Sequence, residues 1–135
     1  MKQTLIVFVQ DEPGVLNRIS SHIRRRNFNI ESLIAGQTER KDITRMTVVL
    51  NEPDRTKQRT VVNSLKELID VYDVIDATEI DSHIREYALV KVALKKDYLD
   101  EVNKIVESAH GKIIDGTDDA TIFELTGYEK EVESV

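Results

Sequence analysis

The apolar pattern of this chain starts twice, and that repeat limits what the chain can fold into. At an offset of 83 residues, apolar positions coincide in four pairs: Leu16 with Leu99, Ile19 with Val102, Ile23 with Val106, and Ile30 with Ile113. Recurrence at a fixed offset is typical of a repeated structural unit, even where the residues are not identical. We therefore expect two related units along the 135 residues.

The first copy opens with a strand and a helix. Residues 4–10 are apolar and β-branched, which predicts a central strand covered on both faces. The segment D-E-P-G then breaks the run. Asp11 is the expected N-cap, and Pro13 suits the first turn of a helix over residues 13–26. The apolar residues of that helix recur at helical spacing: Val15, Leu16, Ile19 and Ile23.

The rest of this copy completes a recognisable order. Asn27 and Asn29 tolerate the left-handed conformation that ends helices. Strands are expected at residues 30–36 and 44–50 as a hairpin, then a helix over 54–70 and a strand over 71–80. The order βαββαβ predicts the ferredoxin-like fold, a four-stranded antiparallel sheet with two helices on one face.

The second copy is shorter. It predicts strands at 87–94, 112–115 and 121–126, and a helix over 98–109 that is ended by Gly111. The inward residues of that helix would be Leu99, Val102, Ile105 and Val106. Only nine residues follow Thr126, whereas a second helix and a fourth strand need about 25. The prediction is an α+β chain with one complete domain (1–80) and an incomplete, apparently truncated βαββ unit (81–135), whose unpaired edge favours association.

Composition excludes several functions. The chain has no cysteine, which removes disulfides, thiolate metal sites and a cysteine nucleophile and fits a cytoplasmic protein. A net charge of −6 and an aromatic content of 5% argue against nucleic-acid binding. No apolar run approaches the ~18 residues of a membrane span. The three histidines lack metal-ligand spacing and no nucleophile or phosphate-loop motif occurs, so we expect no catalytic residue and no metal site.

One motif carries specific chemistry, the D-E-P-G-V-L segment at residues 11–16. A helix N-terminus offers backbone N–H groups and positive dipole density to a carboxylate. Gly14 lets a small ligand approach the backbone, and Asp11 is able to accept from an ammonium group. These are the parts of an amino-acid site, although the same segment also fits a plain strand-to-helix turn. Three arginines at 24–26 are typical of a solvated helix end, with an anion or partner contact as the alternative.

Longer stretches carry a family resemblance. The segments VFVQDEPGVLNRIS, RRRNFNIESLIAG and TRMTVVL resemble the small, regulatory subunit of acetolactate synthase. Such subunits begin with an ACT domain, a ferredoxin-like module that binds amino acids at dimer interfaces. The segments YALVKVAL and GKIIDGTDDATIFELTG resemble, more weakly, the C-terminal ferredoxin-like domain of that family.

The resemblance implies a division of labour between two subunits. The catalytic subunit uses thiamine diphosphate to join pyruvate to a second 2-keto acid in branched-chain amino-acid biosynthesis. FAD is likewise expected only on that subunit. The regulatory subunit binds no cofactor and carries no chemistry. It raises the activity of its partner and confers feedback inhibition, usually by valine.

The resemblance also implies an effector site shared by two protomers of a homodimer. One protomer would supply Asp11, Gly14, Val15 and Leu16, and the other would supply Asn29 and Ile30. Asp11 departs from well-known bacterial members, which carry Asn there, so it keeps the acceptor but loses the amide donor.

Two other functions remain open on the sequence. The first is a free-standing ACT module that senses an amino acid for another enzyme or for a transcriptional response. The second is a small hydrolase of the acylphosphatase kind, which needs a cationic phosphate cradle after the first strand. Asp11 and Glu12 in that loop would repel phosphate, although Arg18 is near.

Overall fold

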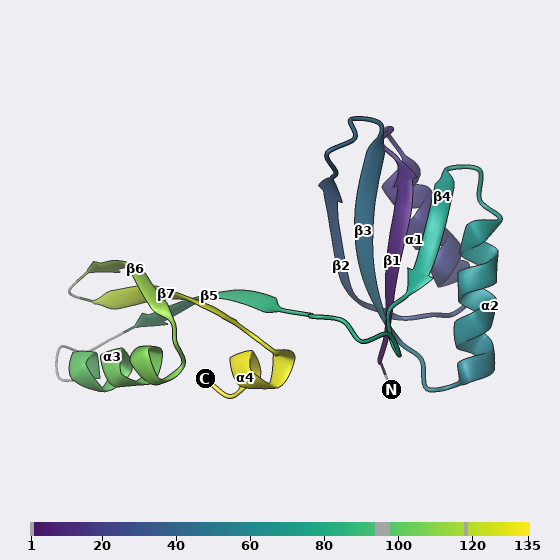
Figure 1. Cartoon of the computed structure of the whole chain (residues 1–135). Helices are drawn as coiled ribbons and strands as arrows, with labels where there is room; N and C mark the ends of the chain where they lie inside the picture. The colour runs from purple at the N-terminus through teal and green to yellow at the C-terminus, as the bar shows by residue number, and fades with distance from the viewer. Residues whose placement is uncertain (1, 94–97, 118) are drawn as a thin grey trace. The chain divides into compact units, whose positions relative to one another are not determined.

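The computed structural model describes residues 2–93, 98–117 and 119–135. It divides into two compact units, Met1–Ser82 and His83–Val135. Both contain strands and helices in the order that the apolar repeat predicts (Figure 1).

The N-terminal unit is a four-stranded antiparallel sheet in the order β2-β3-β1-β4. Helices α1 and α2 lie on one face of it (Figure 1). This confirms the ferredoxin-like prediction, because β1 and β2 are joined through α1 with β3 between them. The elements are β1 (Lys2–Gln10), α1 (Val15–Arg25), β2 (Ile30–Gln37), β3 (Ile43–Asn51), α2 (Arg55–Lys66) and β4 (Val71–Asp76).

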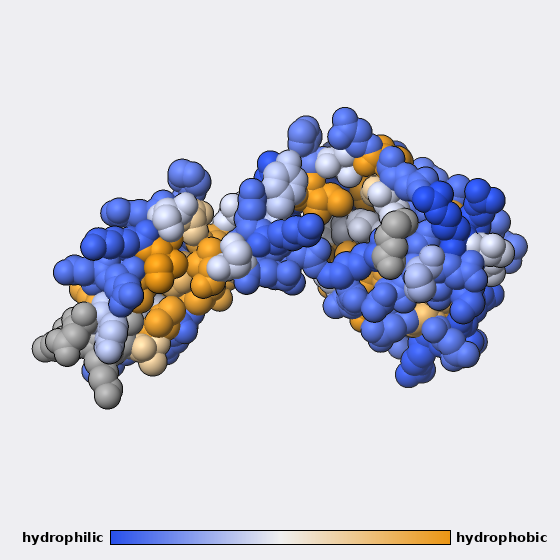
Figure 2. Space-filling view, turned by 90° about the horizontal axis from the view of Figure 1, so that it is seen from below, coloured by the Kyte–Doolittle hydropathy of each residue, from blue (hydrophilic) through white to orange (hydrophobic). Residues whose placement is uncertain are grey.

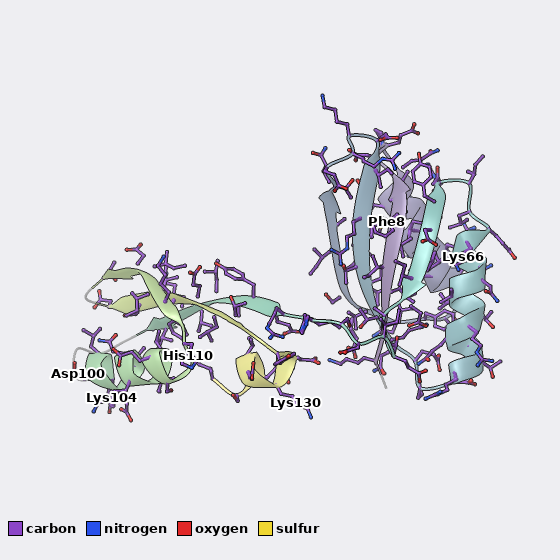
Figure 3. All side chains as sticks on the ribbon, in the orientation of Figure 1. Phe8, Lys66, Asp100, Lys104, His110 and Lys130 are labelled. Atoms are coloured by element: carbon purple, nitrogen blue, oxygen red, sulfur yellow. The ribbon has the colours of Figure 1, made fainter. Side chains whose placement is uncertain are left out.

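The core of this unit lies between the sheet and its helices. Strand β1 alternates, and its buried Leu5, Val7 and Val9 belong to one apolar cluster with Val15, Ile19 and Ile23 of α1. The intervening Ile6 and Phe8 of β1 lie on the opposite face, where Phe8 is labelled in Figure 3. The expectation that this strand is covered on both faces holds within the unit for one face only, because both helices pack on the same side of the sheet, as the ferredoxin-like prediction has it.

The start of α1 differs from the prediction. The helix begins at Val15, two residues later than expected, and Gly14 occupies the N-cap position with a φ of 86°. Asp11 does not cap the helix, because its carboxylate accepts hydrogen bonds from Gln37 and Thr44 instead. The helix ends at Arg25, one residue before the predicted end, and Asn27 adopts the left-handed conformation expected after it, with a φ of 60°.

Helix α2 ends at Lys66, four residues before the predicted end. A turn follows in which the Leu68 N–H donates to the Leu65 carbonyl and the Val71 N–H to the Leu68 carbonyl. The apolar residues of that turn continue the helical spacing, which made the helix look longer. Strand β4 starts at Val71, as predicted, but it is shorter than predicted because it ends at Asp76.

The C-terminal unit repeats the first half of this topology. Its antiparallel sheet has the order β5-β7-β6, with α3 connecting β5 to β6. Residue 94, the predicted end of its first strand, lies outside the described residues. A short fourth helix was not predicted, and it starts where the Tyr128 N–H donates to the Glu131 side chain at 2.7 Å. The elements are β5 (Glu86–Ala93), α3 (Leu99–Ser108), β6 (Lys112–Thr117), β7 (Ala120–Gly127) and α4 (Glu129–Glu133).

Within its described residues, the C-terminal unit has a small core of Val106, Phe123 and Leu125. Leu99 and Ile105 were expected to point inward, but each is 44% exposed. The described part of this unit contains no second long helix. His110, rather than Gly111, takes the left-handed conformation after α3.

Candidate effector site

A pocket lies where the predicted binding motif leaves β1. It measures about 280 Å³ and opens between the β1–α1 connection and strands β2 and β3. Four residues of the motif line it: Asp11, Glu12, Val15 and Leu16. Its other lining residues come from β1, β2 and β3: Val9, Gln10, Ala35, Gly36, Gln37, Thr44 and Met46.

The two helices of the N-terminal unit begin differently. At α2, the carboxylate of Asp54 accepts from the backbone N–H groups of Thr56 at 2.8 Å and Lys57 at 3.4 Å. At α1, the N-cap residue Gly14 makes no side-chain cap, although the Val15 N–H donates to the Glu12 carbonyl at 3.3 Å. Because the first N–H groups of a helix lack partners within it, the start of α1 is suited to an external anion.

Three hydrogen bonds hold Asp11 in the lining of the pocket. Its carboxylate accepts from the Thr44 hydroxyl at 2.9 Å and from the Gln37 amide at 3.1 Å. Its backbone N–H donates to the carbonyl of Asp42 at 3.0 Å. The site therefore pairs a fixed negative group with an uncapped helix end, which matches the two charges of an amino acid.

Asn29 and Ile30 lie in a different hollow of about 320 Å³, together with Asn17, Ser20, Ser21, Arg24 and Phe28. Gly14 precedes the eleven residues of α1, whereas Asn29 follows them. At about 1.5 Å per residue the two ends of the helix are about 16 Å apart. Within one chain, the structure thus brings Asp11, Val15 and Leu16 together and leaves Asn29 and Ile30 apart from them.

Sequence reasoning missed Gln37 and Thr44, which orient Asp11. They lie 26 and 33 residues from it in the chain, and no local pattern marks them. It also missed the role of Asp70, whose carboxylate is 10% exposed and binds Arg18 through two hydrogen bonds. The signal available in the sequence was an acidic residue directly after the apolar Leu68 and Ile69, since an acidic residue that becomes buried there needs a partner.

Arg18 and Asp70 form a two-pronged ion pair that shifts the pKa of both side chains. The Nε–Oδ2 distance is 2.6 Å and the Nη2–Oδ1 distance is 3.0 Å. The hydrogen bond to Arg18 holds the pKa of Asp70 below its usual range, against the opposing effect of burial, and the same bond raises the pKa of Arg18. Because this guanidinium is engaged by Asp70, it makes a poor phosphate cradle, which disfavours the hydrolase hypothesis.

In the part of the chain that the structure describes, no group of three or more histidine, aspartate or glutamate side chains is placed to hold a metal ion. No helix among the described residues is long and apolar enough to cross a membrane.

The sheet order, the two helices on one face and the pocket at the first strand-to-helix turn define the N-terminal unit as an ACT domain. The solved ACT domain of GTP pyrophosphokinase from Chlorobium tepidum matches with a TM-score of 0.51 and 17% identity, over 62% of this chain and 92% of that one, which supports the fold. The family model described as the AHAS small subunit-like ACT domain matches residues 5–73. The model described as the small subunit of acetolactate synthase matches residues 85–135.

Relatives extend the match over nearly the whole chain. The chain is 39% identical to the probable acetolactate synthase small subunit of Archaeoglobus fulgidus, over 98% of this chain and 82% of that protein. It is 36% identical to the acetolactate synthase small subunit of Mycolicibacterium smegmatis, over 98% of this chain and 77% of that protein. The crystal structure of the Thermotoga maritima small subunit matches with a TM-score of 0.90 and 28% identity, over 99% of this chain and 83% of that one. The chain belongs to the family of acetolactate synthase small subunits.

Proposed function

We propose that this chain activates a thiamine-diphosphate-dependent acetolactate synthase catalytic subunit and makes it sensitive to feedback inhibition by a branched-chain amino acid, most of all valine. The observation that carries the effector proposal is the uncapped start of α1 beside the carboxylate of Asp11. Thiamine diphosphate and FAD belong, in this proposal, to the catalytic subunit, and this chain contributes no catalytic group. Membership in a biosynthetic enzyme also leads us to expect a cytoplasmic location.

In this proposal the effector lies along the β1–α1 turn. Its carboxylate takes the N–H groups at the start of α1, near Gly14 to Leu16, and its ammonium group meets Asp11. Its branched side chain packs on Leu16, which is 49% exposed. The pocket volume of about 280 Å³ lies just below the ~300–1,000 Å³ of common small-molecule sites, which suits a ligand as small as valine.

A homodimer completes the proposed site. Asn29 and Ile30 stand at the far end of α1, too distant for one small ligand to touch them and Asp11 in a single chain. A two-fold axis would bring the end of one α1 to the start of the other and create two equivalent sites. Light scattering at micromolar concentration should report a dimer or larger, and a stable monomer would contradict this arrangement.

Calorimetry tests the site directly. Valine, leucine and isoleucine are titrated into the wild type and into the Gly14→Asp and Asn29→Ala variants, and circular dichroism checks the fold. Gly14→Asp should abolish binding, because it forces a side chain onto a φ of 86° and adds a negative charge beside the ligand carboxylate. Asn29→Ala should weaken binding about 10- to 150-fold, as for one lost hydrogen bond to a charged group.

Asn63→Ala is the matched control, because Asn63 is an exposed asparagine of α2 outside the lining of either hollow. Its affinity should equal that of the wild type. If the wild type binds none of the three amino acids at millimolar concentration, or if a folded Gly14→Asp variant binds normally, the site assignment is wrong.

A reconstitution assay tests the regulatory role. The catalytic subunit of the same organism is assayed for acetolactate formation from pyruvate, alone, with this chain, and with this chain plus valine. We expect higher activity with the chain, a decrease on adding valine, and no activity from the chain by itself. Activity of the isolated chain above the level of contaminants would contradict a non-catalytic role.

A further inference from the structure

Both ends of the β1–α1 loop are attached to one residue, Asp70, in the turn between α2 and β4. On the strand side, the Gln10 N–H donates to the Asp70 carbonyl at 2.9 Å. On the helix side, the Arg18 guanidinium donates to both oxygens of the Asp70 carboxylate. The loop that would bind the effector is therefore attached at both ends to a residue that lies 52 positions from Arg18 and 60 positions from Gln10 along the chain.

Arg18 also contacts the last residue of the loop. Its backbone N–H donates to the Gly14 carbonyl at 3.0 Å. A Cβ built on Gly14 would lie 3.2 Å from Arg18 Nη1, so the guanidinium sits close against the Gly14 backbone. Arg18 thus links Asp70 to the residue whose left-handed conformation opens α1.

The pocket lies on the other side of the loop from this ion pair. Its lining includes Asp11 and residues of β2 and β3 but neither Arg18 nor Asp70. On the pocket side, Asp11 is held by Asp42, Thr44 and Gln37. The loop is therefore held from two directions, and the Arg18–Asp70 pair supplies the attachment behind it.

We infer that Asp70, acting through Arg18, is a positioning residue that holds the β1–α1 loop in its effector-binding geometry. This inference rests on the proposed effector site. Holding a loop in its bound geometry raises affinity by removing the cost of ordering it during binding. Because linkage is reciprocal, the effector should in turn stabilise the contacts between the loop and Asp70.

The geometry of the pair distinguishes it from an ordinary surface ion pair. Asp70 is 10% exposed at its side chain and is bound by two parallel hydrogen bonds, an arrangement that only an arginine fork provides. Arg55 and Glu79 form a pair at the same 2.6 Å, but their side chains are 68% and 63% exposed and neither lies on the loop. Arg55 therefore offers a matched control for the loss of one arginine ion pair.

The test measures valine affinity by calorimetry in the full chain. The variants are Arg18→Gln, Arg18→Lys, the double change Arg18→Gln with Asp70→Asn, and the control Arg55→Gln. The double variant leaves no unpaired buried charge, which guards against simple unfolding. Melting temperature and hydrogen exchange at the Gln10 amide are recorded with and without valine.

We expect Arg18→Gln and the double variant to bind valine at least about tenfold more weakly, whereas Arg55→Gln binds as the wild type does. Arg18→Lys should not restore affinity, because a lysine carries the charge but not the fork. Valine should slow exchange at the Gln10 amide in the wild type and not in Arg18→Gln. Failure of the wild type to bind valine contradicts the proposed function. Wild-type binding combined with normal affinity in folded Arg18→Gln and in the double variant contradicts the positioning role alone.

Discussion

The two units share an opening topology but differ in how much each buries. In each, a strand, a helix and two further strands place the third strand between the other two. Among the described residues, thirteen buried apolar side chains form the core cluster of the N-terminal unit, against three in the C-terminal unit. Large apolar side chains such as Tyr87, Leu89 and Ile114 remain half or more exposed in the C-terminal unit, whose surface shows apolar patches in Figure 2.

The difference shows what the closing elements contribute. In the N-terminal unit, α2 and β4 follow the shared opening, and they add Val61, Leu65 and Val74 to the core. In the C-terminal unit the opening is followed by the five residues of α4, none of which is buried. The apolar pattern of α3 therefore specifies where the helix lies in the fold, but it leaves apolar side chains of the unit uncovered. Because less apolar surface is buried, the C-terminal unit should be less stable than the N-terminal unit.

The strongest test is Phe123→Ala, at a side chain that is 2% exposed. Removing such a phenylalanine costs about 3–5 kcal/mol, and among the described residues its cluster has two other buried members, with four partly buried residues packed against them. We expect the C-terminal unit to unfold while the N-terminal unit stays folded, as read by hydrogen exchange across the chain. Tyr87→Ala, at a residue of the same sheet that is 59% exposed, is the control and should leave both units folded. Parallel loss of protection in both units would mean that they unfold as one.

A second test compares two glycines. A Cβ at Gly111 would lie 2.6 Å from Leu125 Cδ2 and 2.9 Å from the Glu124 carbonyl oxygen, whereas a Cβ at Gly36 meets nothing within 4 Å. Gly111→Ala should therefore lower the free energy of unfolding of the C-terminal unit by about 1–3 kcal/mol. Gly36→Ala should change the N-terminal unit little. Urea denaturation measures both, and equal effects would contradict the tight packing at Gly111.

A third test concerns the capped helix α2. Asp54→Ala removes the side chain that accepts from Thr56 and Lys57, and should cost the N-terminal unit about 1 kcal/mol. Asp54→Asn keeps a capping oxygen and should remain close to the wild type. Urea denaturation of both variants provides the measurement. If the alanine and asparagine variants are equally destabilised, the charge of Asp54, rather than its capping hydrogen bonds, stabilises the N-terminal unit.

The smallest expected effect is a pH dependence from His22. Burial is the main reason that the pKa of His22 is lowered, and the nearby Arg26 and Arg25 add to it, whereas Ser64 and Glu67 oppose it. The folded state therefore disfavours the proton that the unfolded chain binds near pH ~6.5. Stability of the N-terminal unit should decrease as the pH falls from about 7.5 to about 5.5.

His22→Gln is the control for that titration. It removes the group, so urea denaturation at the two pH values should show a smaller decrease than in the wild type. The lowered pKa of Asp70 acts in the same direction but at lower pH, because its contribution is lost only as the pH falls below about 3.9 toward the folded-state pKa. An identical decrease in wild type and His22→Gln would show that another group titrates.

Local periodicity explains why the order of strands and helices could be predicted. Alternating or helical spacing of aliphatic residues is a short-range property, and both units follow it. The left-handed Asn27 was predictable for the same reason, since a helix end and its residue type are neighbours. Boundaries that depend on distant residues were not predictable in this way. Helix α2 ends at Lys66, although its apolar spacing continues through the following turn.

The binding motif shows, within one loop, which properties follow from the sequence and which follow from the tertiary structure. Sequence alone placed Asp11 and Gly14 at a strand-to-helix turn with the chemistry for a small zwitterion, because those residue types determine what the turn can offer. Only the tertiary structure decided that Gly14, not Asp11, is the N-cap of α1. The carboxylate of Asp11 binds Thr44 of β3 and Gln37 of β2 instead of the helix end. It also decided that both ends of the loop attach to Asp70, since hydrogen bonds between residues about 50–60 positions apart form only after the sheet has assembled.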